Sequence, residues 1–331
     1  MSIQIHGGDI YAFDRPILDF SASIDPLGAP ESVIAAARDS LENLDRYPDD
    51  KCRALTLALA QKEGGKPENI LCGNGAEELI YATMQALRPR RVLIVSPTFS
   101  EYERAALSVG AQIIKYTLDE KNGFCIEEDI LNYTKQADIT FICDPNNPTG
   151  RLTDAGLIKK IAENADFTVI DRSFEDFANC EKINFSKNML LIKSFTKIYA
   201  IPALRLGYAV GSGEIINRIN NAKPRWSVSI PAQAAGLAAL SETDFIEKSL
   251  KYINAEKEFI YKRLDELKIK YFKSDANFIL FKCDIQLYDI LLEKGILIRD
   301  CASFGLNGFY RTAVKRHNEN EILIKALEAC I

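Results

Sequence analysis

Histidine is nearly absent from this chain of 331 residues, in which only His6 and His317 occur. So few imidazoles leave little material for a histidine-built metal site or for a Ser-His-Asp triad. We therefore expect any chemistry to use a base other than histidine, no metal to be bound, and His317 to have a structural role.

Paired cysteines and an export signal are also missing. The eight cysteines form no Cys-x-x-Cys motif and occur at 52, 72, 125, 143, 180, 283, 301 and 330. The first residues contain neither the basic nor the apolar segment of a secretory signal peptide. Both observations favour a cytoplasmic protein with reduced thiols.

Long apolar runs and a surplus of basic residues are lacking as well. No run approaches the roughly 18 residues of a membrane helix, so no membrane partner is expected. The 41 Lys and Arg are outnumbered by 46 Asp and Glu, which gives a net charge of −5 and argues against nucleic-acid binding. At roughly 150 residues per domain, the length predicts about two domains.

Short apolar runs alternate with amphipathic helical patterns in the middle of the chain. The runs are nearly continuous, which favours strands buried on both faces of a parallel sheet. They lie at 70–72, 92–95, 139–143, 167–170, 189–192 and 206–210, and helical patterns cover 77–87, 100–108 and 155–164. This alternation predicts an α/β domain with a mostly parallel sheet.

The pattern changes after Pro231. Residues 232–267 read as two long helices with Gly236 as their weak point, and they precede short strands and a last helix that begins near His317. The expected strands lie near 276–282, 296–299 and 309–314. We thus expect an N-terminal arm (1–30), a large α/β domain (31–235) and a smaller C-terminal α+β domain (236–331).

Polar groups follow the ends of several predicted strands, where ligands bind in parallel α/β sheets. Residues 73–78 form a glycine-containing turn into a helix, which is either an ordinary tight turn or a phosphate site made of backbone N–H groups. Phe99 follows the next strand, where core packing is its alternative role. Asn147 and Asp171 follow two further strands.

The strand at 189–192 is followed by a hydroxyl, an amine and a guanidinium, from Ser194, Lys197 and Arg205. A lysine forms Schiff bases with aldehydes, and an arginine binds phosphate through two parallel hydrogen bonds. A carboxylate such as that of Asp171 keeps a pyridine nitrogen protonated. Together these groups suit pyridoxal phosphate (PLP).

In their order along the chain, these motifs resemble the PLP-dependent enzymes of the aspartate-aminotransferase fold type (fold type I), over nearly the whole length. The motifs are Asn74-Gly75, Phe99, Asn147-Pro148-Thr149-Gly150, Asp171, Ser194-x-x-Lys197 and Arg205. The resemblance implies that Lys197 anchors the cofactor and shuttles protons, and that Asp171 binds the ring nitrogen. It assigns the ring hydroxyl to Asn147, stacking to Phe99, and the phosphate to Gly75, Ala76, Glu77, Ser194 and Arg205.

The same resemblance assigns roles beyond the cofactor ring. Tyr47 is similar to the tyrosine that reaches the cofactor phosphate of a neighbouring subunit, which implies a homodimer with shared sites. Arg311 is similar to the arginine that holds the substrate α-carboxylate. Two positions depart from the pattern, because Arg172 replaces an acidic residue and Phe174 replaces a tyrosine. Both are expected to alter the charge or the electronics near the ring.

Further strings are similar to the branch that contains histidinol-phosphate aminotransferases and threonine-phosphate decarboxylases. Residues 274–278 fit both groups, whereas five strings favour the decarboxylases: 6–8, 18–28, 197–202, 225–228 and 298–301. The decarboxylases usually carry asparagines where this chain has Ser23 and Asp25, and another near Ser229.

The resemblance thus implies a PLP-dependent decarboxylase of threonine phosphate or serine phosphate, which supplies an amino-alcohol phosphate for cobamide (cobalamin) synthesis. Arg311, Arg299 and His6 are its expected substrate-binding residues. A surface ion pair is the alternative for Arg299, and an untethered terminus is the alternative for His6. Histidinol-phosphate aminotransferase is the main alternative activity. A PLP-binding regulatory domain is a third reading, which the acidic charge disfavours.

Overall fold

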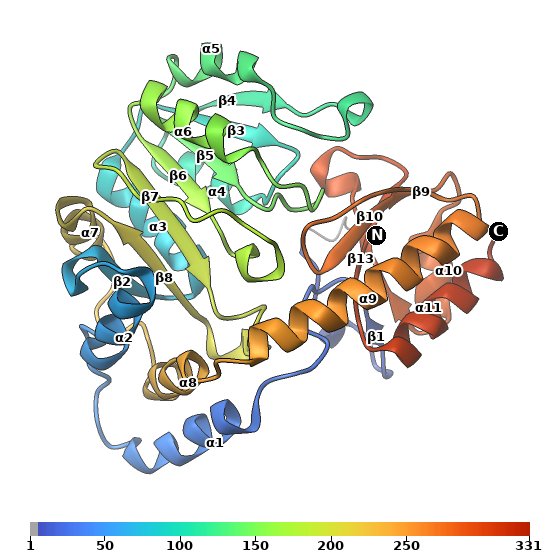
Figure 1. Ribbon diagram of the computed structural model, residues 1–331, viewed down its shortest axis with the longest axis horizontal. Helices are drawn as coiled ribbons and strands as arrows, with labels where there is room; N and C mark the ends of the chain where they lie inside the picture. The colour runs from blue at the N-terminus through green and yellow to red at the C-terminus, as the bar shows by residue number, and fades with distance from the viewer. Residues whose placement is uncertain (1–5) are drawn as a thin grey trace.

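A seven-stranded sheet lies at the centre of the larger part of the molecule, in a computed structural model that describes residues 6–331 (Figure 1). The strand order is β2-β8-β7-β6-β5-β3-β4. The strands are β2 (Ile70–Asn74), β3 (Arg91–Ser96), β4 (Gln112–Thr117), β5 (Ile139–Cys143), β6 (Thr168–Asp171), β7 (Met189–Ser194) and β8 (Leu206–Gly211).

The prediction of a mostly parallel sheet is confirmed, with one exception in strand direction. Neighbours among β4, β3, β5, β6 and β7 pair in parallel, whereas β8 runs antiparallel to both β7 and β2. The expected parallel orientation of 206–210 was therefore wrong, because continuous apolar character reports burial on two faces and not direction. Edge strand β4 was missed, since its polar residues obscure the apolar run.

Helices pack on both faces of this sheet (Figure 1). Successive residues of β7 show why the strand is apolar throughout: Leu191 belongs to one buried cluster, and Leu190 and Ile192 belong to the cluster on the opposite face. The helices of this part are α1 (Glu31–Asp39), α2 (Arg53–Glu63), α3 (Gly75–Leu87), α4 (Glu101–Ser108), α5 (Leu131–Thr134), α6 (Ala155–Asn164), α7 (Gly213–Asn220) and α8 (Ile230–Leu240).

The C-terminal part has a four-stranded antiparallel sheet in the order β12-β13-β10-β9. Its strands are β9 (Lys270–Phe272), β10 (Phe278–Lys282), β12 (Arg299–Asp300) and β13 (Phe309–Ala313), and its helices are α9 (Phe245–Glu266), α10 (Leu287–Glu293) and α11 (His317–Glu328). Near the N-terminus, β1 (Leu18–Asp19) pairs in parallel with β11 (Ile296–Leu297). The N-terminal segment thus lies against the C-terminal part.

The two expected helices after Pro231 are present, but the break between them follows Leu240 and not Gly236. Gly236 lies inside α8, where an added Cβ would come within 2.6 Å of Leu206, so the glycine permits close packing on β8. The boundary expected between 235 and 236 therefore falls within a helix that packs on α1 and α2. Within residues 6–331, none of the helices combines the length and apolar character needed to cross a bilayer.

Candidate active site

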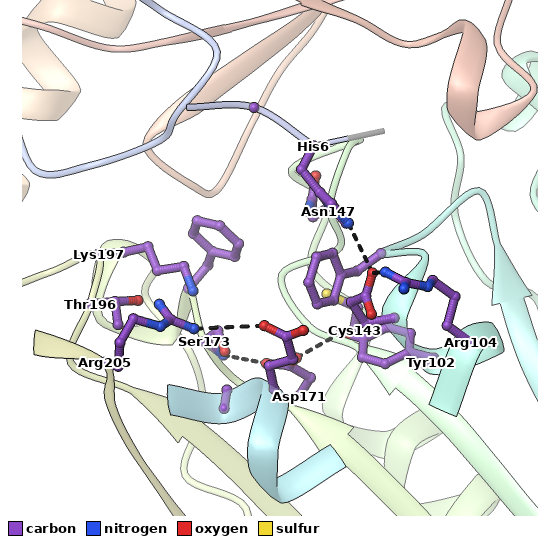
Figure 2. A pocket seen from close by; sticks show the side chains of 16 residues that line it. His6, Tyr102, Arg104, Cys143, Asn147, Asp171, Ser173, Thr196, Lys197 and Arg205 are labelled. Carbon is purple, nitrogen blue, oxygen red and sulfur yellow. Dashed lines mark hydrogen bonds and ion pairs between the residues drawn. The ribbon is translucent and has the colours of Figure 1, made fainter. Parts of the chain in front are cut away.

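Two adjoining cavities, the first of which is drawn in Figure 2, open beyond the carboxyl ends of β5, β6 and β7. The first has a volume of about 400 Å³ and is lined by most of the predicted cofactor residues: Ala76, Glu77, Phe99, Asn147, Asp171, Lys197 and Arg205. The second, of about 550 Å³, shares Phe99, Asn147, Lys197 and Arg205 with the first and adds Arg299 and Arg311. The structure thus brings together residues that lie more than 200 positions apart.

Asp171 ends β6, and its side chain accepts hydrogen bonds from two donors. The Tyr102 hydroxyl donates to Oδ2 at 2.8 Å, and the backbone N–H of Ser173 donates to Oδ1 at 2.8 Å. Only 4% of Asp171 is exposed. A buried carboxylate fixed in this way is a suitable partner for a protonated ring nitrogen.

Lys197 extends from the segment that follows β7 into the first cavity (Figure 2), and it also lines the second. Its Nζ lies 5.6 Å from the centre of the Phe174 ring. Burial lowers the pKa of Lys197, and the negative charge of Asp171 opposes that change. A lowered pKa increases the fraction of neutral amine, which is the nucleophilic form.

The start of α3 and Arg205 form the end of the cavity that suits a phosphate. Gly75 has φ +78°, and an added Cβ would lie 2.8 Å from Nη2 of Arg205. Arg205 itself adopts a left-handed conformation, with φ 56°. Free N–H groups at a helix N-terminus and an adjacent guanidinium bind phosphate well.

Ser194 lies behind this end and does not line either cavity. Its hydroxyl is 2.7 Å from the hydroxyl of Thr196, which does line the first cavity. Thr196 is therefore a site residue that the sequence analysis missed, and the phosphate contact expected for Ser194 stays a prediction.

Asn147 is positioned by its neighbour Asn146. The Asn146 side chain donates to the carbonyl of Pro97 at 3.0 Å and accepts a hydrogen bond from Thr98 at 3.0 Å, which ties the loop after β5 to the loop that carries Phe99. Asn147 Oδ1 in turn accepts a hydrogen bond from Nη1 of Arg311. The expected ring-hydroxyl and carboxylate residues therefore contact each other directly.

Arg311 and Arg299 are paired residues on β13 and β12, and both line the second cavity. Arg311 Nη2 donates to the Ser21 carbonyl at 2.7 Å, whereas its buried Nε makes no hydrogen bond to the described residues. Burial lowers the pKa of Arg311 to about 10, so it remains charged at neutral pH. Arg299 Nη2 donates to Ser303 at 2.6 Å. A surface ion pair for Arg299 is ruled out, because its side chain is buried.

The two departures from the family pattern occupy different positions. Arg172 lines neither cavity and pairs with Asp144 at 2.9 Å, and its expected effect on the charge near the ring stays a prediction. Phe174 does line the cavity, where its ring packs edge-on against Phe278 at 5.1 Å.

The N-terminal arm reaches the cavity through His6, whose Nε2 lies 2.9 Å from the buried carboxylate of Glu101. His6 is thus tethered and lines both cavities. Tyr47, by contrast, lines neither cavity of its own chain. It is 81% exposed, and its ring centre lies 5.2 Å from that of Trp226.

The family-model comparison identifies the chain over residues 15–327 as aminotransferase class I and II. This chain belongs to that family. It is 37% identical to the threonine-phosphate decarboxylase of Salmonella typhimurium, over 94% of this chain and 90% of the relative. It is 34% identical to the adenosylcobalamin biosynthesis bifunctional protein CobDQ of Leptospira interrogans, over 98% of this chain and 41% of that protein. Among solved structures, the histidinol-phosphate aminotransferase of Clostridium acetobutylicum matches with a TM-score of 0.88 and 30% identity, over 95% and 98% of the two chains.

Class I and II aminotransferases use PLP, and the residues present here fit that cofactor. The cradle at Gly75 has no room for a side chain, Asp171 is fixed by two hydrogen bonds, and Lys197 has a lowered pKa beside it. When bound, the cofactor ring accepts the electron pair released at the substrate Cα.

Tyr102 is another site residue that the sequence analysis missed. It lies three residues after Phe99, so the two share one side of the chain as it enters α4, and their ring centres are 5.7 Å apart. This helical spacing was the only signal in the sequence, and an interior aromatic of a helix is more often a packing residue.

Proposed function

We propose that this chain is a PLP-dependent decarboxylase of an O-phospho amino acid, threonine phosphate or serine phosphate. The observation that carries the proposal is that Arg299 and Arg311, which lie opposite each other on β12 and β13, line the same cavity as Lys197. A substrate with a carboxylate and a phosphate carries two anionic groups, and each requires its own cationic partner when it leaves water.

The two arginines have distinct roles in this proposal. Arg311, which contacts Asn147, holds the α-carboxylate near the cofactor ring. Arg299 and His6, which line the second cavity, hold the phosphate. Lys197 is the only lysine among the described residues lining either cavity, and it carries the proton that Cα requires after CO₂ leaves.

The product would be the amino-alcohol phosphate that corresponds to the substrate. Its use in cobamide synthesis is supported by the likeness to the Salmonella decarboxylase and to CobDQ. Histidinol-phosphate aminotransferase is the second candidate, favoured by the close structural match to the Clostridium enzyme. Histidinol phosphate has a phosphate but no carboxylate, so it leaves one of the two arginines without an anion when it is bound.

The proposal includes a homodimer with shared sites. Tyr47, Trp226 and Leu44 are large apolar residues that are 81%, 49% and 77% exposed, and such side chains are common where a second subunit packs. Light scattering on purified protein would give twice the mass of one chain if this is correct. The mass of a single chain would contradict it.

The activity is tested by incubating the PLP-loaded protein with threonine phosphate and, separately, with serine phosphate. We expect CO₂ and the matching amino-alcohol phosphate from at least one of them. Glutamate formed from 2-oxoglutarate and histidinol phosphate, without CO₂ from either phospho amino acid, would establish the second candidate instead. A Lys197→Ala variant should give neither product.

A further inference from the structure

Two cysteines outside the active site line one surface hollow of about 410 Å³. Cys52 immediately precedes α2, and Cys72 lies in β2. Both are free thiols, and Thr56, one turn after Cys52 on α2, has its hydroxyl 3.8 Å from the Cys72 sulfur. Both side chains line this hollow, where they are 4% and 3% exposed.

The environments of the two sulfurs differ. Cys52 is the N-cap residue of α2, and a helix N-terminus favours a thiolate. The hydrogen bond from Cys72 lowers the pKa of Cys52, as does the charge of Lys223, while burial and the charges of Asp49 and Asp50 oppose this. The same contact and burial raise the pKa of Cys72. The pair thus consists of a more acidic thiol at the start of α2 and a less acidic one on the adjacent strand.

We propose that Cys52 and Cys72 form a reversible disulfide when the protein meets a small-molecule disulfide such as oxidised glutathione. The Cys52 thiolate attacks one sulfur of the reagent and releases the first glutathione as its thiolate. Cys72 then loses its proton and attacks the Cys52 sulfur, which releases the second glutathione. The two protein thiols are oxidised to one disulfide, and the reagent is reduced to two thiols.

The position of this cross-link gives it a structural consequence. It joins the start of α2 to the strand that leads, three residues later, into the phosphate turn at Gly75. The oxidised form therefore fixes α2 to the strand that positions that turn. The proposal does not depend on the reaction that the active site catalyses.

The test treats the PLP-loaded protein with oxidised glutathione, blocks the remaining thiols with N-ethylmaleimide and maps the peptides by mass spectrometry. We expect a peptide pair linked through Cys52 and Cys72 that dithiothreitol separates. Cys52→Ser and Cys72→Ser variants should lack it, whereas a Cys330→Ser variant, changed at a partly exposed cysteine, should retain it.

Two results would overturn the proposal, and both can be read from the unaltered protein. One is full N-ethylmaleimide labelling of Cys52 and Cys72 under conditions in which Cys125 or Cys330 has formed a mixed disulfide with glutathione. The other is a stable mixed disulfide at Cys52 or at Cys72 without any cross-link between them.

Discussion

The guanidinium of Arg172 pairs with the carboxylate of Asp144 at 2.9 Å, and both side chains are buried. The other Asp144 oxygen accepts a hydrogen bond from the Thr153 backbone at 2.7 Å. Because the two residues adjoin β6 and β5, the ion pair joins the loop after Asp171 to the loop that carries Asn147. Arg172 thus holds these two loops of the site together, although it lines neither cavity.

Replacement of Arg172 by alanine should destabilise the fold more than it changes the chemistry. The variant leaves the Asp144 carboxylate buried without its cation, and burial already raises the pKa of Asp144. Loss of one partner of a buried pair typically costs about 3–5 kcal/mol. Urea unfolding measures the change, and Lys159→Ala, which removes an exposed ion pair, is the control. Unfolding at the same urea concentration as the parent would contradict this role.

Tyr102→Phe should weaken PLP binding. The variant removes one of the two hydrogen bonds that hold Asp171, and a hydrogen bond to a charged group contributes about 1.5–3 kcal/mol, so the dissociation constant should rise about 10- to 150-fold. Equilibrium titration of apoenzyme with PLP measures it. Tyr116→Phe removes a comparable bond to Asp129 elsewhere and should leave the constant unchanged. Equal losses in the two variants would show that the effect is not local.

Asp25→Asn should stabilise the protein at pH 8 and have little effect at pH 4. Burial raises the pKa of Asp25 to about 6, whereas the hydrogen bond from Leu27 opposes the change. The folded chain therefore binds this proton more tightly than the unfolded chain, so stability falls as pH rises from about 4 to about 6, by up to about 3 kcal/mol.

Asparagine stays neutral and can accept the same Leu27 hydrogen bond, so it avoids the cost of burying a charge. Urea unfolding at the two pH values measures the difference. Asp45→Asn, at an exposed carboxylate, is the control and should change stability at neither pH. A gain for Asp25→Asn that is equal at pH 4 and pH 8 would contradict the shifted pKa.

Arg299→Met should impair turnover of phosphorylated substrates selectively. Removal of one partner of a buried charged contact costs about 2–5 kcal/mol, so kcat/KM for the phospho amino acid should fall about 30- to several-thousand-fold. The residual activity toward the same amino acid without its phosphate should change little. Arg263→Met, on the surface of α9, is the control. Equal losses with and without the phosphate would remove Arg299 from phosphate binding.

The parts of the site that were predicted from sequence are the short strings at strand ends. Asp171 and Lys197 each follow an apolar strand, and parallel strands bring their carboxyl ends together, so local pattern and sheet topology together locate these residues. The direction of β8 was not predictable in this way, because apolar continuity does not distinguish parallel from antiparallel pairing.

The parts that were missed depend on contacts between distant segments. Nothing near Arg172 in the sequence indicates that its partner is Asp144, 28 residues earlier, because the contact arises from the pairing of β5 with β6. Thr196 was missed for a local reason, because Ser194 and Thr196 are both small hydroxyl residues, and the sequence does not show which of them lines the cavity.

The most direct test of the central claim measures CO₂ and glutamate in one mixture of the PLP-loaded protein with threonine phosphate, histidinol phosphate and 2-oxoglutarate. Our account predicts that CO₂ forms together with an equal amount of amino-alcohol phosphate, and that glutamate formation is minor. Glutamate as the main product, with no CO₂ released from threonine phosphate or from serine phosphate in its place, would contradict it.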